Sequence, residues 1–356
     1  MGEHGATVGI VANPASGRDI RRLVAQASVF PTAEKANMVQ RVLAACGVVG
    51  VRRAVVSVDL GGISAALVRA LRLRRPAKHG PWPEIEFCED LELTDSAADT
   101  TNAVRRMVEA GAGAILCLGG DGTARVAASA CGDVPLLPLS TGTNNAFPRI
   151  REATVAGTAV ALVASARVDP DRGTTRAKVL EVRADGRREL AMVDVCSSTE
   201  QHVGSRALWN PESLAELYCT FAEPEGIGLS SVPGLLHPVA RDSARGVAVR
   251  LAPPEAAETV VTAPVAPGLL RPVGVRDWWS VPQDEPAELG RGCGVLALDG
   301  ERELELRDGR PASVALRADG PRCVDVPAVL AEAAEKGLLR RESPALRDGR
   351  REVRTP

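Results

Sequence analysis

Several features that a 356-residue chain commonly has are scarce here. Aromatic residues make up 3% of the sequence, and only four of its 43 basic residues are lysines. The formal net charge is −2 and no stretch concentrates positive charge, which argues against nucleic-acid or membrane-surface partners. The N-terminus does not look like a signal peptide, and no run approaches the roughly 20 apolar residues of a membrane span. We therefore expect a cytoplasmic protein that binds neither nucleic acid nor membrane.

Absent sequence motifs exclude further classes of protein. No G-x-x-x-x-G-K-[ST] occurs, which excludes a P-loop enzyme, and no G-x-G-x-x-G follows the first expected strand, which disfavours an NAD-dependent dehydrogenase. The eight cysteines include no C-x-x-C pair and have no histidine at zinc spacing. We interpret them as small buried hydrophobic residues and predict no protein metal site.

The length predicts two domains, over residues 1–150 and 151–340, followed by a flexible tail over 341–356. In the first domain, strand-like and helix-like segments alternate, as a parallel sheet with crossover helices requires. The expected strands are 6–12, 54–58, 84–93, 114–118 and 134–139, and the expected helices are 33–46 with Thr32 as N-cap, 63–73 and 96–110. One more helix, 155–164, is expected just after the boundary, at the start of the second domain.

The second domain is expected to be mainly antiparallel, because short β-like segments there are separated by Gly, Pro and Asp turns. A helical interlude over 211–222 and a last helix over 326–336 interrupt and close it. The expected strands are 178–183, 189–196, 246–251, 258–262, 294–298, 303–306 and 313–317.

A glycine-rich turn, residues 119–123, stands between an apolar strand and a helical segment and reads Gly-Gly-Asp-Gly-Thr. Glycines let phosphate approach the backbone N–H groups at a helix N-terminus. Phosphate binding alone does not explain Asp121, because a carboxylate repels phosphates unless it takes a proton, handles magnesium or fixes a hydroxylated substrate. The turn predicts a kinase; the alternative is an ordinary turn in which Asp121 caps a helix beginning at Thr123.

Two further polar loops follow expected strands, Asn13-Pro14-Ala15-Ser16-Gly17-Arg18 and Ser140-Thr141-Gly142-Thr143-Asn144-Asn145. Ligands of parallel sheets collect at the carboxyl ends of the strands, so these loops and the glycine turn are predicted to share one crevice. Taken alone, the first loop could be a common turn, and the second a polar helix cap.

The chain resembles the ATP-NAD kinase family, and more narrowly its branch related to acetoin-catabolism protein X. The resemblance rests on NPASGR at 13–18, LGGDGT at 118–123, PLSTGTNNAFP at 138–148 and LDGERE at 298–303. It implies a Rossmann-like N-terminal domain, a β-sandwich-like C-terminal domain and a homo-oligomer. It also implies phosphoryl transfer from ATP, with Mg²⁺, to a hydroxyl of NAD or another small metabolite.

The resemblance also assigns roles to residues. Asp121 would orient or deprotonate the acceptor hydroxyl, and Glu301 of Asp299-Gly300-Glu301 is a second catalytic candidate, although Asp-Gly alone predicts a hairpin turn. Asn144, Asn145 and Asp194 would lie on the substrate side. The nucleotide and its phosphates would contact Asn13, Ser16, Gly17, Arg18, Gly119, Gly120, Gly122, Thr123, Thr141, Gly142 and Thr143.

One departure from the family pattern concerns the acceptor. NAD kinases carry an Asn followed by an acidic residue early in the second domain, whereas this chain has Val193 before Asp194. Valine cannot make the hydrogen bonds of an amide, which puts NAD in doubt as the acceptor. A diacylglycerol-type lipid kinase and a catalytically silent nucleotide sensor stay open as alternatives.

Overall fold

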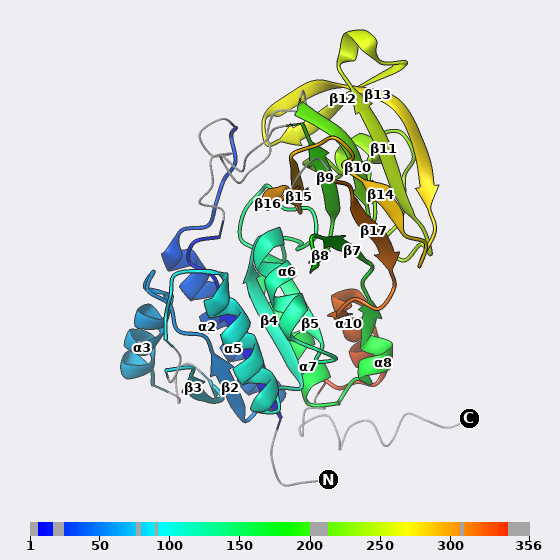
Figure 1. Ribbon diagram of the computed structural model, residues 1–356. Coiled ribbons are helices and arrows are strands. Elements are labelled where there is room, and N and C mark those ends of the chain that lie inside the picture. Colours follow the sequence, from blue (N-terminus) through cyan, green and yellow to red (C-terminus); the bar gives the residue numbers. More distant parts are fainter. Residues whose placement is uncertain are drawn as a thin grey trace, which may run out of the picture.

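A computed structural model describes residues 6–16, 25–75, 80–89, 92–199, 213–306 and 310–340, apart from the side chains of residues 302 and 303. Figure 1 shows two regions, a parallel sheet flanked by helices and, above it, a β-rich region. The fold is therefore α/β, with a parallel-sheet N-terminal domain and a C-terminal domain of antiparallel sheets, as predicted.

The N-terminal sheet has the order β3-β2-β1-β4-β5-β18-β6, and its first five strands are parallel. The strand order changes direction at β1. Strands β2 and β3 lie on one side of β1, and β4 and β5 lie on its other side. The strands are β1 (Thr7–Ala12), β2 (Arg53–Val56), β3 (Glu84–Phe87), β4 (Ala114–Gly119), β5 (Leu136–Ser140), β6 (Thr174–Arg176) and β18 (Arg322–Val324).

Helices cover both faces of this sheet because its central strands are apolar on both sides. One apolar cluster joins the sheet to α2 (Thr32–Val49), α3 (Ile63–Leu73), α7 (Ala153–Ala164) and α10 (Val326–Glu335). The cluster on the other face joins it to α5 (Ala97–Glu109) and α6 (Asp121–Ala130). The short helix α8 (Pro170–Gly173) lies beside α10.

The C-terminal region packs two antiparallel sheets face to face, with an apolar cluster between them. The larger sheet has the order β12-β13-β11-β10-β9-β15-β16, and the smaller one β14-β17-β7-β8. The strands are β7 (Val179–Ala184), β8 (Arg187–Ala191), β9 (Asp194–Ser198), β10 (Leu214–Cys219), β11 (Gly246–Ala252), β12 (Thr259–Ala266), β13 (Leu269–Val281), β14 (Ala287–Leu289), β15 (Val295–Leu298), β16 (Glu301–Glu305) and β17 (Ala312–Arg317), with the short helices α9 (Ser231–Gly234) and η2 (Pro254–Ala256).

The chain then returns to the first sheet, where Cys323 of β18 pairs in parallel with Leu136 of β5. The division of the chain at residue 150 stays a prediction, and the predicted tail lies outside the described residues. Seven of the eight cysteines are buried, which confirms their interpretation as core residues.

Several details of the predicted secondary structure were wrong. The helix expected over 211–222 is strand β10, because pairing with β9 and β11 on both edges outweighs the local helix propensity. The strand expected over 189–196 is two strands, β8 and β9, separated at Met192 and Val193. Pro31, not Thr32, precedes the first turn of α2, and its carbonyl accepts the N–H groups of Glu34 and Lys35.

Candidate active site

The three polar loops converge at the carboxyl ends of β1, β4 and β5. Asn13 Nδ2 donates to Thr123 Oγ1 over 3.0 Å, and the hydroxyls of Ser16 and Thr141 lie 2.8 Å apart. The Thr141 N–H donates to the carbonyl of Gly119 over 3.1 Å. Loops separated by about 130 residues therefore form one floor, at the point of the sheet where ligands of α/β proteins bind.

A buried lysine, Lys35 of α2, holds the first loop from below. Its side chain is 1% exposed, and Nζ lies within 3.2 Å of the carbonyls of Asn13, Pro14 and Ser16 and 2.8 Å from Ser16 Oγ. Gly17 and Arg18 of this loop lie outside the described residues. The ammonium places a fixed positive charge under the predicted phosphate-binding loop, where it favours an anionic ligand.

The glycines of the second turn allow close packing within the protein itself. A Cβ on Gly119 would lie 2.5 Å from Thr123, and one on Gly120 would lie 2.7 Å from Asn145 Oδ1. A Cβ on Gly122 would lie 3.5 Å from Glu301, an ordinary contact. Two of the three glycines are therefore required by neighbouring side chains, and contact of the turn with donor phosphates stays a prediction.

Asp121 is the first residue of α6, and its carboxylate is bound by a different loop. The Ala146 N–H donates to both of its oxygens, over 3.2 Å and 3.0 Å, and the Phe147 N–H donates to Oδ1 over 2.8 Å. Gly120 is the N-cap of α6 and no side-chain cap is formed, so the alternative of Asp121 capping a helix that begins at Thr123 is wrong. Asp121 is half-buried, with its carboxylate oriented by the third loop.

The third loop divides into buried and exposed parts. Thr141 and Gly142 are buried, whereas Thr143 is exposed and exchanges hydrogen bonds with the backbone of Ser28. Asn144 and Asn145 are half-buried, and Asn145 Nδ2 donates to Ser140 Oγ over 2.7 Å. Thr143, Asn144 and Asn145 can therefore reach a ligand, while Thr141 supports the loop.

Asp299 and Gly300 form a two-residue hairpin turn between β15 and β16, the alternative that Asp-Gly predicts. The Asp299 side chain is nevertheless completely buried. Its Oδ1 accepts the N–H groups of Met192, Val193 and Asp194 over 3.0, 2.7 and 3.3 Å. Asp299 thus holds the turn that separates β8 from β9, which explains why the predicted single strand is broken there.

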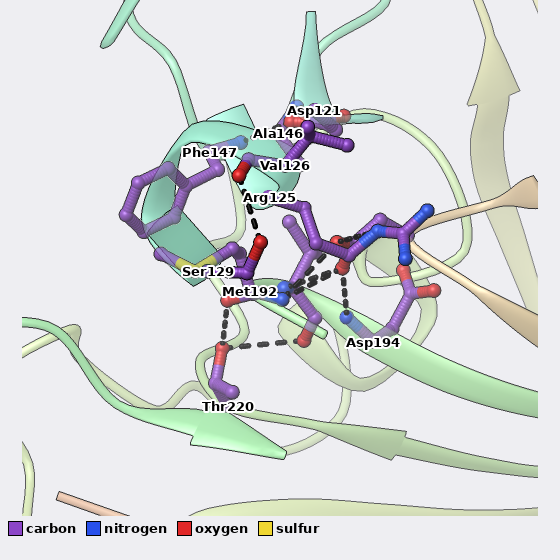
Figure 2. Close-up of polar contacts among 11 residues, drawn as sticks. Asp121, Arg125, Val126, Ser129, Ala146, Phe147, Met192, Asp194 and Thr220 are labelled. Atoms are coloured by element: carbon purple, nitrogen blue, oxygen red, sulfur yellow. Dashed lines mark hydrogen bonds and ion pairs between the residues drawn. The ribbon is translucent and has the colours of Figure 1, made fainter. Parts of the chain in front are cut away.

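Arg125 approaches the same carboxylate from α6, with Nε 3.4 Å from Asp299 Oδ2. Figure 2 shows its side chain extending from the helix toward the backbone at Met192 and Asp194, with Asp121 at the start of the same helix. Burial raises the pKa of Asp299 to about 7, although the Arg125 charge and the backbone N–H groups oppose that rise. The Asp121 charge adds to the rise, which places the two carboxylates within electrostatic reach.

The substrate-side residues differ in exposure. Asp194 is 5% exposed at the start of β9 and therefore lies beneath the surface of the site. Val193 packs into an apolar cluster between the two regions, with Met192, Phe147 and Phe221. The side chain at the position where NAD kinases carry asparagine thus has a packing role in this protein.

Glu301 begins β16 and is half-buried. Its carboxylate lies beside Gly122, the residue after Asp121, as its predicted role requires. A catalytic role for Glu301 stays a prediction.

Sequence reasoning missed four residues of this site: Arg125, Asp299 as a buried acid, Lys35 and Arg241. Arg125 follows Asp121 by four residues, and helical spacing alone could have placed both on one face. Lys35 could have been noticed because lysine is rare in this chain. No local pattern marks Asp299 as buried, and none connects Arg241, which donates to the carbonyls of Ala146 and Phe147, with the site.

Comparison with known proteins agrees with this architecture. Residues 8–167 match the ATP-NAD kinase N-terminal domain family, and residues 178–319 match the acetoin catabolism protein X C-terminal domain family. The protein thus has an NAD kinase-type domain followed by antiparallel sheets, which supports a kinase-type phosphotransferase acting on a small molecule.

The chain is 42% identical over 338 residues to acetoin catabolism protein X of Cupriavidus necator, and the alignment covers 94% of both chains. The protein belongs to the acetoin catabolism protein X family, which confirms the resemblance found in the sequence. Among the described residues, no helix has the length and apolar character needed to cross a bilayer.

Proposed function

We propose that the protein is an ATP-dependent kinase that phosphorylates a hydroxyl of a small polyhydroxylated metabolite, NAD or a related compound. The observation that carries this proposal is the position of the Asp121 carboxylate. It lies at the start of α6, held by the loop after β5, in a floor formed by three loops at the strand ends.

In this proposal Asp121 orients or deprotonates the acceptor hydroxyl. The N–H groups of Ala146 and Phe147 donate to both carboxylate oxygens, and such hydrogen bonds favour the ionised form over the protonated one. An ionised carboxylate of fixed orientation is what a general base needs, since it must lie within hydrogen-bond reach of the proton that it takes. Glu301 is the second candidate for proton transfer.

The donor is proposed to lie over the loop floor, where the α6 N-terminus and the Lys35 charge favour phosphate. Asn13, Ser16, Thr141 and Thr143 would support it, and Gly17, Arg18, Gly119, Gly120, Gly122, Thr123 and Gly142 complete the predicted set. Magnesium usually binds through one or two carboxylates together with substrate phosphates, and Asp121 and Glu301 fit that requirement. Bound Mg²⁺ would neutralise charge on the transferring phosphoryl group.

The acceptor is proposed to contact Asn144, Asn145 and the wall near Asp194. Val193 supplies packing in place of an amide, which favours an acceptor other than NAD. The relative's name refers to acetoin catabolism, so acetoin, which carries one hydroxyl group, belongs among the acceptors tested together with dinucleotides, sugars and polyols.

The proposal is tested by ATP consumption with these acceptors, comparing the protein with its Asp121→Asn variant. Asparagine has nearly the same shape but cannot accept a proton, so turnover should fall by about 10²–10⁴-fold while the fold is kept. Circular dichroism and the unfolding midpoint verify the fold. Near-normal turnover of the variant would contradict the proposed role.

Two alternatives make different predictions in the same assay. Consumption of ATP only with diacylglycerol would favour a lipid kinase. Binding of ATP without consumption for any acceptor would favour a nucleotide sensor. We also propose that the protein forms a homo-oligomer and is located in the cytoplasm.

A further inference from the structure

The loop that orients Asp121 is itself held from the opposite side by the C-terminal region. Asp121 accepts the N–H groups of Ala146 and Phe147, and the Arg241 guanidinium donates to the carbonyls of the same two residues. Arg241 Nη2 lies 2.6 Å from the Ala146 carbonyl, and Nη1 lies 3.0 Å from that of Phe147. The dipeptide is therefore fixed between an anion and a cation that come from different regions.

Several contacts fix the guanidinium in turn. Glu223 accepts from Nε and Nη2, each over 3.0 Å, in a bidentate pair. The guanidinium lies 4.0 Å from the centroid of the Phe221 ring and 5.5 Å from that of Phe147. Its plane is thereby held in one orientation, which the weaker directionality of lysine would not reproduce.

The backbone that carries Arg241 is anchored as well. Lys178 is 6% exposed, and its Nζ donates to the carbonyls of Ala240 and Arg245 over 3.2 Å and 2.7 Å. Ala222, beside Glu223, forms a β-bridge with Val239. The arginine and its carboxylate partner are thus both attached to a supported segment of the C-terminal region.

We propose that Arg241 is a positioning residue through which the C-terminal region fixes the orientation of the Asp121 carboxylate. One peptide group, whose carbonyl is that of Ala146 and whose N–H is that of Phe147, contacts Arg241 at one end and Asp121 at the other. Such a chain of hydrogen bonds strengthens each member, because every bond polarises the next. The catalytic consequence rests on the proposed function, whereas the structural coupling does not.

The first test needs no substrate. Amide hydrogen exchange is measured at Ala146 and Phe147 in the protein and in Arg241→Gln, Arg241→Lys and Arg149→Gln variants. Arg149 pairs with the same Glu223 carboxylate over 3.0 Å but is exposed, so its variant is the matched control. We expect exchange to rise about tenfold or more in Arg241→Gln, less in Arg241→Lys, and little in Arg149→Gln.

A double-variant cycle separates coupling from general loosening. Asp121→Ala should accelerate exchange at the same two amides, and Asp121→Ala combined with Arg241→Gln should accelerate it by less than the product of the two single effects. Protection of the β1 amides verifies that each variant is folded; if Arg241→Gln does not fold, Arg241→Lys carries the test. Unchanged exchange at Ala146 and Phe147, or multiplicative effects in the cycle, would overturn the proposal.

Once an acceptor is known, a second readout tests the catalytic consequence. Arg241→Gln should lower kcat about tenfold or more while the KM for ATP changes less than about twofold, because orientation of Asp121 matters most in the transition state. Arg241→Lys should recover part of kcat. Failure to find any acceptor would count against the proposed kinase activity and would leave the exchange result to decide the positioning role.

Discussion

Two hairpins of the C-terminal region share the same turn sequence and nearly the same backbone. Asp185-Gly186 joins β7 to β8, and Asp299-Gly300 joins β15 to β16. Their φ angles are 47° and 77° in the first turn and 52° and 76° in the second. Asp185 is exposed, whereas the side chain of Asp299 is buried and binds three backbone N–H groups beside Arg125.

The difference shows which properties are local and which are not. Asp-Gly selects the turn in both hairpins, because both residues tolerate a positive φ. Burial of Asp299 arises only when β15 pairs with β9 and places the turn against α6 of the other region. Local sequence therefore determines the turn, and tertiary packing determines which of the two carboxylates belongs to the site.

The largest expected difference between the two turns is in stability. Asp299→Ala removes the acceptor of three buried backbone N–H groups and the carboxylate that faces Arg125, so we expect a loss of about 3–5 kcal/mol in the free energy of unfolding. Urea unfolding at pH 8 measures it. The matched Asp185→Ala variant should lose less than about 2 kcal/mol, the cost of an alanine at a positive φ. Equal losses at both turns would contradict the role given to burial.

The second largest difference is expected in turnover, when the residue that follows each turn is substituted. Glu301 faces Gly122 near Asp121, whereas Arg187 is exposed at the corresponding position of the other hairpin. If Glu301 assists proton transfer, Glu301→Gln should lower kcat about 100-fold, and Arg187→Gln should leave it unchanged. ATP consumption with the identified acceptor measures both. A Glu301→Gln variant with full activity would remove Glu301 from the catalytic set.

The two glycines should behave alike, because the backbone requirement is the same. Gly186→Ala and Gly300→Ala each force an alanine into the left-handed region, at a cost of about 1–2 kcal/mol. Thermal or urea unfolding of both variants provides the comparison. A much larger loss at Gly300 would mean that its turn is constrained by more than backbone conformation.

The smallest expected difference concerns pH. The pKa of Asp299 rises from 3.8 to about 7 on folding, so its contribution to stability is fully present below pH 3.8 and is lost as the pH rises through 7. Lowering the pH from 8 to 6 should therefore raise the free energy of unfolding by about 1 kcal/mol through this group. Asp185→Asn should keep that gain and Asp299→Asn should lose it. The same gain in Asp299→Asn would assign the titration to another group.

Much of the fold follows from the sequence, because apolar periodicity and turn residues are local signals. The helix over Ile63–Leu73 and the strand at β1 lie where periodicity places them. Strand β10 does not, since its pairing partners are distant in sequence. In the site, strand topology explains why the three loops meet, and helical spacing relates Arg125 to Asp121. Burial of Asp299 and the position of Arg241 depend on contacts between regions that no local pattern encodes.

The central claim is that Asp121 serves transfer of a phosphoryl group to a metabolite hydroxyl. It is tested most directly by incubating a metabolite extract with ATP and either the protein or its Asp121→Asn variant, followed by mass spectrometry. The account predicts one species that gains a phosphate with the protein and not with the variant. No phosphorylated species with the protein, or equal amounts with both, would contradict it.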